Sequence, residues 1–183
     1  MRNLIYTINL TIDGCFDHAP TAPDDELLEY CTRQVQDAGL LLYGRKTYQM
    51  MVPYWPDILK NLSGESKADI EFARAFESCN KIVFSRTLNK AEGNNTRIVH
   101  ADLQEEILKL KQEQGKNMLV GGVALPSQLI ALGLVDEFLF LVHPVIAGKG
   151  KRWFEGIDLQ EKLKLVGSKT FKSGCIALHY SKQ

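Results

Sequence analysis

This 183-residue chain has no excess of charge of either sign. Its 22 lysines and arginines balance 22 aspartates and glutamates, so the formal net charge is zero. A strongly basic protein can be drawn to nucleic acid or to an anionic membrane by its overall field, and this chain has no such field. We therefore expect neither nucleic acid nor a membrane as partner. Any anion that the protein binds must be held by local groups.

Long hydrophobic runs and paired cysteines are also missing. No apolar run reaches the ~20 residues that span a bilayer, and residues 1–6 lead into strand-like sequence without an apolar signal region. We therefore expect a cytoplasmic protein. The cysteines are far apart without a C-x-x-C pair, so we expect reduced thiols rather than a disulfide framework or a metal site; they are Cys15, Cys31, Cys79 and Cys175.

Strand-like and helix-like segments alternate along the chain. Its length and its hydrophobic content of 45% are enough for a full core, and they predict one domain over residues 1–183. Asp24 and Asp102 precede two helical patterns and belong to the residue types that cap helices. The expected strands cover 4–12, 40–43, 81–85, 97–100 and 118–120, and the expected helices include 27–35, 45–51 (ended by Pro53), 68–77, 103–114 and 124–132.

The C-terminal part departs from this alternation. Its two extended segments, 137–145 and 163–180, have no long helix between them, so we expect them to be antiparallel neighbours. The predicted fold class is α/β, a three-layer α/β/α sandwich with a mostly parallel mixed sheet and an antiparallel C-terminal edge.

One strand end has the residues of an anion site. Gly44 closes the apolar strand 40–43 and allows a ligand to approach the backbone, and Arg45, Lys46 and Thr47 follow where a helix begins. The first N–H groups of a helix have no intrahelical partner and carry the positive end of its dipole, so cations and a hydroxyl there favour a phosphate. The alternative is that Arg45 and Lys46 only solvate a loop.

Two further strand ends add groups of the same kind. Ser85 and Arg86 offer a hydroxyl and a guanidinium, and Gly121 and Gly122 can bring bare backbone N–H groups close to a pyrophosphate. Because ligands of open α/β sheets bind beyond the carboxyl ends of the strands, the three ends predict a ligand with a pyrophosphate and a separate monophosphate, such as NADPH. The alternatives are an ordinary tight turn and a surface loop. No G-x-G-x-x-G is present, which argues against a Rossmann dehydrogenase.

The order of motifs along the chain carries a family resemblance. The motifs are Asp13-Gly14, Gly44-Arg45-Lys46-Thr47-Tyr48, Tyr54-Trp55-Pro56, Ser85-Arg86-Thr87, Gly121-Gly122, Leu134-Val135-Asp136-Glu137 and the 144–150 segment PVIAGKG. In this order they resemble the dihydrofolate-reductase-like superfamily, and more narrowly the reductase domain of the bifunctional riboflavin-biosynthesis deaminase/reductase. The resemblance covers essentially the whole chain. It implies a homodimer and an NADPH site built from Gly44, Arg45, Lys46, Thr47, Ser85, Arg86, Gly121 and Gly122.

The substrate side is less defined. Asp13 and Gly14 end the first strand beside the expected nicotinamide position, and Tyr54 and Trp55 can form an aromatic wall for a planar ring. The alternative is that Trp55 is a core residue, as tryptophan more often is. The resemblance also implies an acid on the first helix; Asp24, Asp25, Glu26 and Glu29 crowd that region, and we expect them to cap the helix and face solvent.

Two function classes remain open from the sequence. The first is an NADPH-dependent reductase that transfers hydride to a small planar heterocycle, pteridine-like or ribosylamino-pyrimidine-like. The second is an NADP(H)-binding protein of the same fold without efficient turnover. Hydride transfer is the cofactor's chemistry, so a weak acid/base signature does not exclude an enzyme, and no residue is identified as catalytic. His143 is either a proton donor or a hydrogen-bonded strand residue.

The C-terminal segment predicts association of two chains. Residues 137–142 are almost entirely apolar, and an edge strand of that kind needs a cover. Trp153 and Phe154 follow flexible glycines and are residue types that anchor interfaces. We expect a homodimer formed by this edge and its loop, unless the aromatic pair folds back onto its own sheet.

Overall fold

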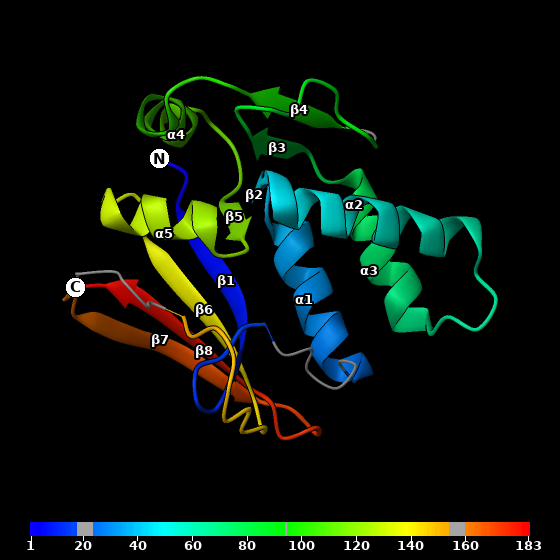
Figure 1. Ribbon diagram of the computed structural model, residues 1–183. Coiled ribbons are helices and arrows are strands. Elements are labelled where there is room, and N and C mark those ends of the chain that lie inside the picture. Colours follow the sequence, from blue (N-terminus) through cyan, green and yellow to red (C-terminus); the bar gives the residue numbers. More distant parts are fainter. Residues whose placement is uncertain (18–23, 94, 154–159) are drawn as a thin grey trace.

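A single mixed sheet organises the computed structural model of the chain (Figure 1), which describes residues 1–17, 24–93, 95–153 and 160–183. In these ranges the sheet has eight strands in the order β4-β3-β2-β5-β1-β6-β8-β7. The strands are β1 (Leu4–Thr11), β2 (Leu40–Gly44), β3 (Lys81–Phe84), β4 (Thr96–Val99), β5 (Met118–Gly121), β6 (Glu137–His143), β7 (Leu163–Thr170) and β8 (Ile176–Lys182).

Six strands run parallel to one another, and the last two join the sheet through antiparallel pairs. Each neighbouring pair from β4 to β6 is parallel, whereas β8 is antiparallel to both β6 and β7. The predicted fold class, a mostly parallel sheet with an antiparallel C-terminal edge, is confirmed.

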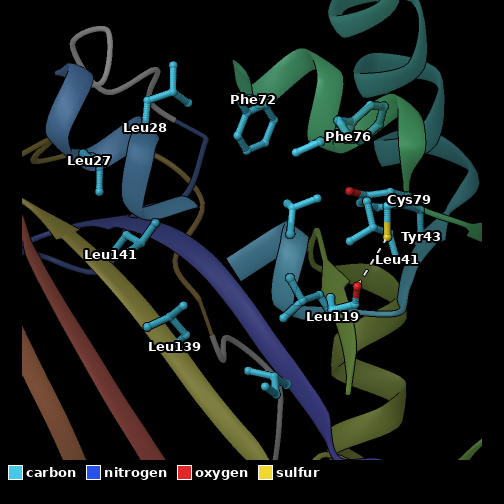
Figure 2. Close-up of a cluster of buried hydrophobic side chains, with 14 of the residues drawn as sticks. Leu27, Leu28, Leu41, Tyr43, Phe72, Phe76, Cys79, Leu119, Leu139 and Leu141 are labelled. Carbon is cyan, nitrogen blue, oxygen red and sulfur yellow. Dashed lines mark hydrogen bonds between the residues drawn. The ribbon is translucent and has the colours of Figure 1, made fainter. Parts of the chain in front are cut away.

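Helices cover both faces of the sheet, as the three-layer prediction requires. Alternate residues of β1 enter different cores, Ile5 on one face and Leu4 and Tyr6 on the other. Helices α1 (Asp25–Asp37), α2 (Arg45–Lys60) and α3 (Lys67–Ser78) supply the first core, while α4 (Leu103–Gln112) and α5 (Ala124–Ala131) supply the second. Figure 2 shows side chains of β2, β5 and β6 in the first core pointing toward α1 and α3. No helix in the described part is long and apolar enough to cross a membrane.

The strand order corrects the sequence interpretation of the C-terminal edge. Segment 163–180 is a hairpin of β7 and β8 rather than one strand, and its turn closes where Gly174 adopts φ +82° and Phe171 N–H donates to the Cys175 carbonyl at 2.9 Å. Strand β6 is consequently interior, between β1 and β8, and its apolar residues are covered within the chain. The edge is β7, where Leu165 and Val166 are exposed.

The proposed aromatic anchor also packs within the chain. Trp153 is half-buried, and its ring centroid lies 4.5 Å from that of Phe140 and 5.8 Å from that of Tyr6. Phe154 lies outside the described residues. The grounds given for the dimer are therefore wrong for β6 and Trp153, and the dimer itself stays a prediction.

Helix α2 is longer than its sequence indicates. Instead of ending at Pro53 it continues through Pro53 and Pro56 to Lys60. An interior proline costs about 3 kcal/mol, whereas burying one large apolar side chain stabilises by about 1.5–3 kcal/mol. Burial of Val52 and Ile58, together with contact of Trp55 with Phe72 at a centroid distance of 4.3 Å, offsets that cost.

Candidate functional site

A cavity of about 1190 Å³ opens at the carboxyl ends of the parallel strands. Strand β5 ends at Gly121, opposite Thr7 of β1, while β1 continues to Thr11. The chain leaves the sheet after Gly121, and the cavity lies at this interruption. All eight residues of the predicted cofactor site line it: Gly44, Arg45, Lys46, Thr47, Ser85, Arg86, Gly121 and Gly122. The structure brings the three strand ends together, and their binding of a cofactor stays a prediction.

The N-terminus of α2 is one wall of the cavity. Its N-cap residue is Gly44, and no side chain caps it, whereas Asp24, Ser66 and Asp102 cap α1, α3 and α4 with their side chains. The caps predicted at Asp24 and Asp102 are thus confirmed. Backbone N–H groups at an uncapped helix start are suited to an anion. Gly44 has φ −80° and ψ 161°, which other residues also adopt, so its backbone conformation does not require glycine.

The double glycine packs directly against α2. Gly122 has φ +91°, and a β-carbon there would overlap Oγ1 of Thr47. Its carbonyl accepts a hydrogen bond from the Tyr6 hydroxyl at 3.0 Å. The following helix, α5, has Val123 as its N-cap and also lacks a side-chain cap. Two uncapped helix starts therefore meet at the cavity.

The third strand end lies at β3. The Ser85 hydroxyl oxygen accepts hydrogen bonds from the N–H groups of Thr87 at 3.2 Å and Leu88 at 3.0 Å, which hold the loop in place while its hydrogen can still be donated. Arg86 is exposed on the cavity wall, as is His100 at the end of β4. The sequence interpretation missed His100, although it too directly follows a strand.

The four predicted substrate residues are not among those that line this cavity: Asp13, Gly14, Tyr54 and Trp55. Tyr54 is exposed on α2, and Trp55 packs against Phe72 in the first core. Met50 and Met51, one turn earlier on the same helix, line the cavity instead. Contact between those four residues and a substrate therefore stays a prediction without support from the cavity.

Asp13 fastens a loop. Its carboxylate accepts hydrogen bonds from Thr11 Oγ1 at 2.7 Å, Ala147 N–H at 3.0 Å and Gly148 N–H at 2.9 Å. These bonds, with the one from Ala147 N–H the largest contributor, hold the pKa of Asp13 well below its ordinary value. The neighbouring Gly14 adds a further hydrogen bond to the same region, because its carbonyl accepts from Trp153 N–H at 2.9 Å. Asp13 ties the end of β1 to the segment after β6.

The first helix presents neutral residues to the cavity. Cys31, Gln34 and Val35 of α1 line it, whereas Asp24, Asp25, Glu26 and Glu29 do not. Asp24 caps α1 and accepts from Ser173 N–H at 2.9 Å, and Glu26 pairs with Lys169 at 3.1 Å. Gln34 and Val35 lie three and four residues after Cys31, so the three residues share one face of the helix. This spacing is visible in the sequence and could have identified the side of α1 that faces the cavity. Burial raises the pKa of the Cys31 thiol to about 12, so the thiol stays protonated.

His143 is a hydrogen-bonded strand residue, as one of the two sequence interpretations has it. It is buried, and its Nε2 lies 2.9 Å from Oδ1 of Asn9, a cavity-lining residue that the sequence interpretation missed. Burial lowers the pKa of His143. The imidazole is therefore neutral near pH 7.

Comparison with known proteins gives one family and several relatives. The family model described as the RibD C-terminal domain matches residues 2–177. The uncharacterized protein YyaP of Bacillus subtilis is 33% identical over 187 residues, which cover 98% of this chain and 94% of that protein. The uncharacterized protein YwjB of the same organism is 29% identical over 99 residues, covering 54% of this chain and 56% of that protein.

Two solved structures share the fold. A putative riboflavin biosynthesis protein from Shewanella superposes with a TM-score of 0.67 at 16% identity, covering 99% of both chains. Dihydrofolate reductase from Enterococcus faecalis, solved in complex with NADP(H) and RAB-propyl, superposes with a TM-score of 0.64 at 15% identity, covering 99% of this chain and 96% of that one.

Proposed function

Since the chain belongs to the RibD C-terminal domain family, we propose that it is an NADPH-dependent reductase of a small planar heterocycle, pteridine-like or ribosylamino-pyrimidine-like. The family match confirms the resemblance drawn from the order of motifs, and it supports a reductase-type function. The observation that carries the proposal is the convergence of three phosphate-type strand ends on one cavity. The three ends lie about forty residues apart along the chain, and the parallel sheet brings them to the edge at which open α/β sheets bind their ligands.

The cavity has groups suited to each phosphate of NADPH. The uncapped starts of α2 and α5 and the bare backbone of Gly121 and Gly122 suit a pyrophosphate. Arg45, Ser85 and Arg86 provide charge and hydrogen-bond donors for the 2′-phosphate that distinguishes NADPH from NADH. A protein of this fold solved with NADP(H) supports the same cofactor class.

In this proposal NADPH supplies a hydride, and the second hydrogen reaches the substrate as a proton. The chain's own contribution is to hold both molecules in place, against a lining whose apolar part includes Met50, Met51 and Phe72. The protonated Cys31 thiol is not a nucleophile, so no covalent intermediate through Cys31 is proposed. Water is the proposed source of the proton.

The second candidate function is NADP(H) binding without efficient turnover. One observation favours it: the residues of β1 and α1 that line the cavity carry no charge at neutral pH and include no general acid. For either function, we still predict a homodimer and a cytoplasmic location.

The test follows NADPH oxidation with panels of pteridines, pyrimidines and quinones. The variants are Arg86→Ala and, as matched control, Arg74→Ala, an exposed arginine of α3 that lines a separate hollow of about 340 Å³. Turnover that falls in Arg86→Ala and is kept in Arg74→Ala supports the reductase. Tight NADPH binding without turnover on any panel member supports the binding protein, and absence of NADPH binding contradicts both.

A further inference from the structure

The cavity wall formed by β1 and α1 is polar but uncharged. Six residues of these elements line the cavity: Thr7, Ile8, Asn9, Cys31, Gln34 and Val35. Asp17, which follows β1 and also lines the cavity, accepts a hydrogen bond from Lys151 N–H at 2.9 Å and so helps to fix the loop after β6. A ligand that reaches this wall meets side-chain amides rather than carboxylates.

The Asn9 amide has a defined partner on the next strand. Asn9 pairs with Leu141 across the parallel β1–β6 ladder, and His143 lies two residues further on the same face. Nε2 of His143 and Oδ1 of Asn9 are 2.9 Å apart. Because His143 is 4% exposed and burial lowers its pKa, its imidazole is neutral and carries one N–H.

The contact between the His143 ring and the Asn9 side chain defines both the protonated ring nitrogen and the orientation of the Asn9 amide. Oδ1 of Asn9 is an acceptor only, so Nε2 must be the protonated nitrogen and donate to it. The other terminal atom, the amide nitrogen, then points away from His143. Asn9 is exposed and lines the cavity, so this nitrogen offers its N–H donors to a ligand.

We infer that Asn9, oriented by His143, selects a ring that carries a carbonyl oxygen over the same ring carrying an amino group in its place. This selectivity rests on the proposed function and narrows its substrate class to oxo-substituted heterocycles. A carbonyl oxygen accepts from the amide N–H, whereas an amino group would place donor against donor and lose a hydrogen bond. In this arrangement Asn9 contacts the substrate, and His143 is a positioning residue.

Two pteridines that exchange carbonyl groups for amino groups test the inference. Lumazine carries two ring carbonyls, and diaminopteridine carries amino groups at the same positions. Dissociation constants of both are measured with the wild-type chain, with and without NADP⁺. We expect lumazine to bind roughly tenfold more tightly, the effect of about one hydrogen bond. Equal binding, tighter binding of diaminopteridine, or no binding of either ring overturns the inference.

Variants of Asn9 and His143 distinguish loss of the amide orientation from general damage to the site. Asn9→Asp presents only acceptors, so the preference should reverse toward diaminopteridine. His143→Ala should bring the two dissociation constants together, because the released amide can turn either end to the ligand, whereas His143→Gln keeps an N–H donor and should keep the preference. A purely structural role would weaken both ligands equally in His143→Ala, and that result overturns the positioning role.

A measurement without ligand checks the same arrangement. Nitrogen-detected NMR of the wild-type chain at pH 7 should show His143 neutral, with the proton on Nε2; a proton on Nδ1 or a charged ring overturns the inference. Failure of the proposed function is distinguishable, since it appears as absent NADPH binding or oxidation, while ring selectivity and the tautomer are measured without cofactor.

Discussion

Thr47 fills the space that a side chain on Gly122 would need. A β-carbon on Gly122 would overlap Oγ1 of Thr47 and lie 3.2 Å from its Cβ. The first turn of α2 and the turn before α5, two of the three phosphate-type elements, are thereby held against each other.

We predict that Gly122→Ala destabilises the fold more than Gly64→Ala does. Both glycines have positive φ, +91° and +88°, but nothing lies within 4 Å of a β-carbon on Gly64. The backbone strain common to both costs about 1–2 kcal/mol, and overpacking against Thr47 adds about 1–3 kcal/mol. Denaturant unfolding measures the two losses.

Thr47→Ala should recover part of the loss in Gly122→Ala, because it removes Oγ1 and leaves Cβ. Equal losses in Gly122→Ala and Gly64→Ala, or strictly additive effects of the two substitutions at 47 and 122, would disagree with this packing.

A carboxylate at the start of α2 should stabilise the fold and weaken the binding of NADPH. Gly44→Asp adopts the same extended backbone and supplies the side-chain cap that α2 lacks, so it should be about 1 kcal/mol more stable than Gly44→Ala. The same carboxylate occupies the N–H groups and repels a phosphate, so NADPH should bind roughly tenfold more weakly than to Gly44→Ala. Calorimetric titration of both variants is the measurement. Undiminished NADPH affinity in Gly44→Asp would remove the helix start from the site.

Asp13 should stabilise the protein in a pH-dependent way. Its folded-state pKa is lowered by the hydrogen bonds from Ala147, Thr11 and Gly148. Its contribution is therefore fully present above the unfolded pKa of about 3.9 and is lost as the pH falls through the lower folded value. Wild type should exceed Asp13→Asn in unfolding free energy near pH 7, and the gap should shrink in acid. Asp37→Asn, an exposed carboxylate at the end of α1, is the control. A gap independent of pH would refute the role of the charge.

We predict a dimer that uses the β7 edge. Leu165 and Val166 on this edge are 51% and 57% exposed. Light scattering after gel filtration should give twice the chain mass of 20.6 kDa, and Val166→Lys should lower it. Leu62→Lys, an exposed leucine in the loop after α2, should not. A wild-type mass of one chain at micromolar concentration would exclude the dimer.

The sequence predicts the phosphate side of the cavity better than its substrate side. Arg45, Ser85 and Gly122 each follow a strand directly, and parallel strands bring such ends together whatever their order. Asn9 lies within β1, and it faces the cavity only because β5 stops beside Thr7, a register set by strands more than 100 residues apart. The interior position of β6 was missed for the same reason, since sequence order does not give strand order.

Titration of the wild-type chain with NADPH and with NADH tests the central claim most directly. If Arg45, Ser85 and Arg86 surround a 2′-phosphate at this cavity, NADPH should bind at least about tenfold more tightly than NADH, because charge-assisted hydrogen bonds contribute about 1.5–3 kcal/mol. Equal affinity for the two cofactors, or binding of neither, would contradict the proposed NADPH site.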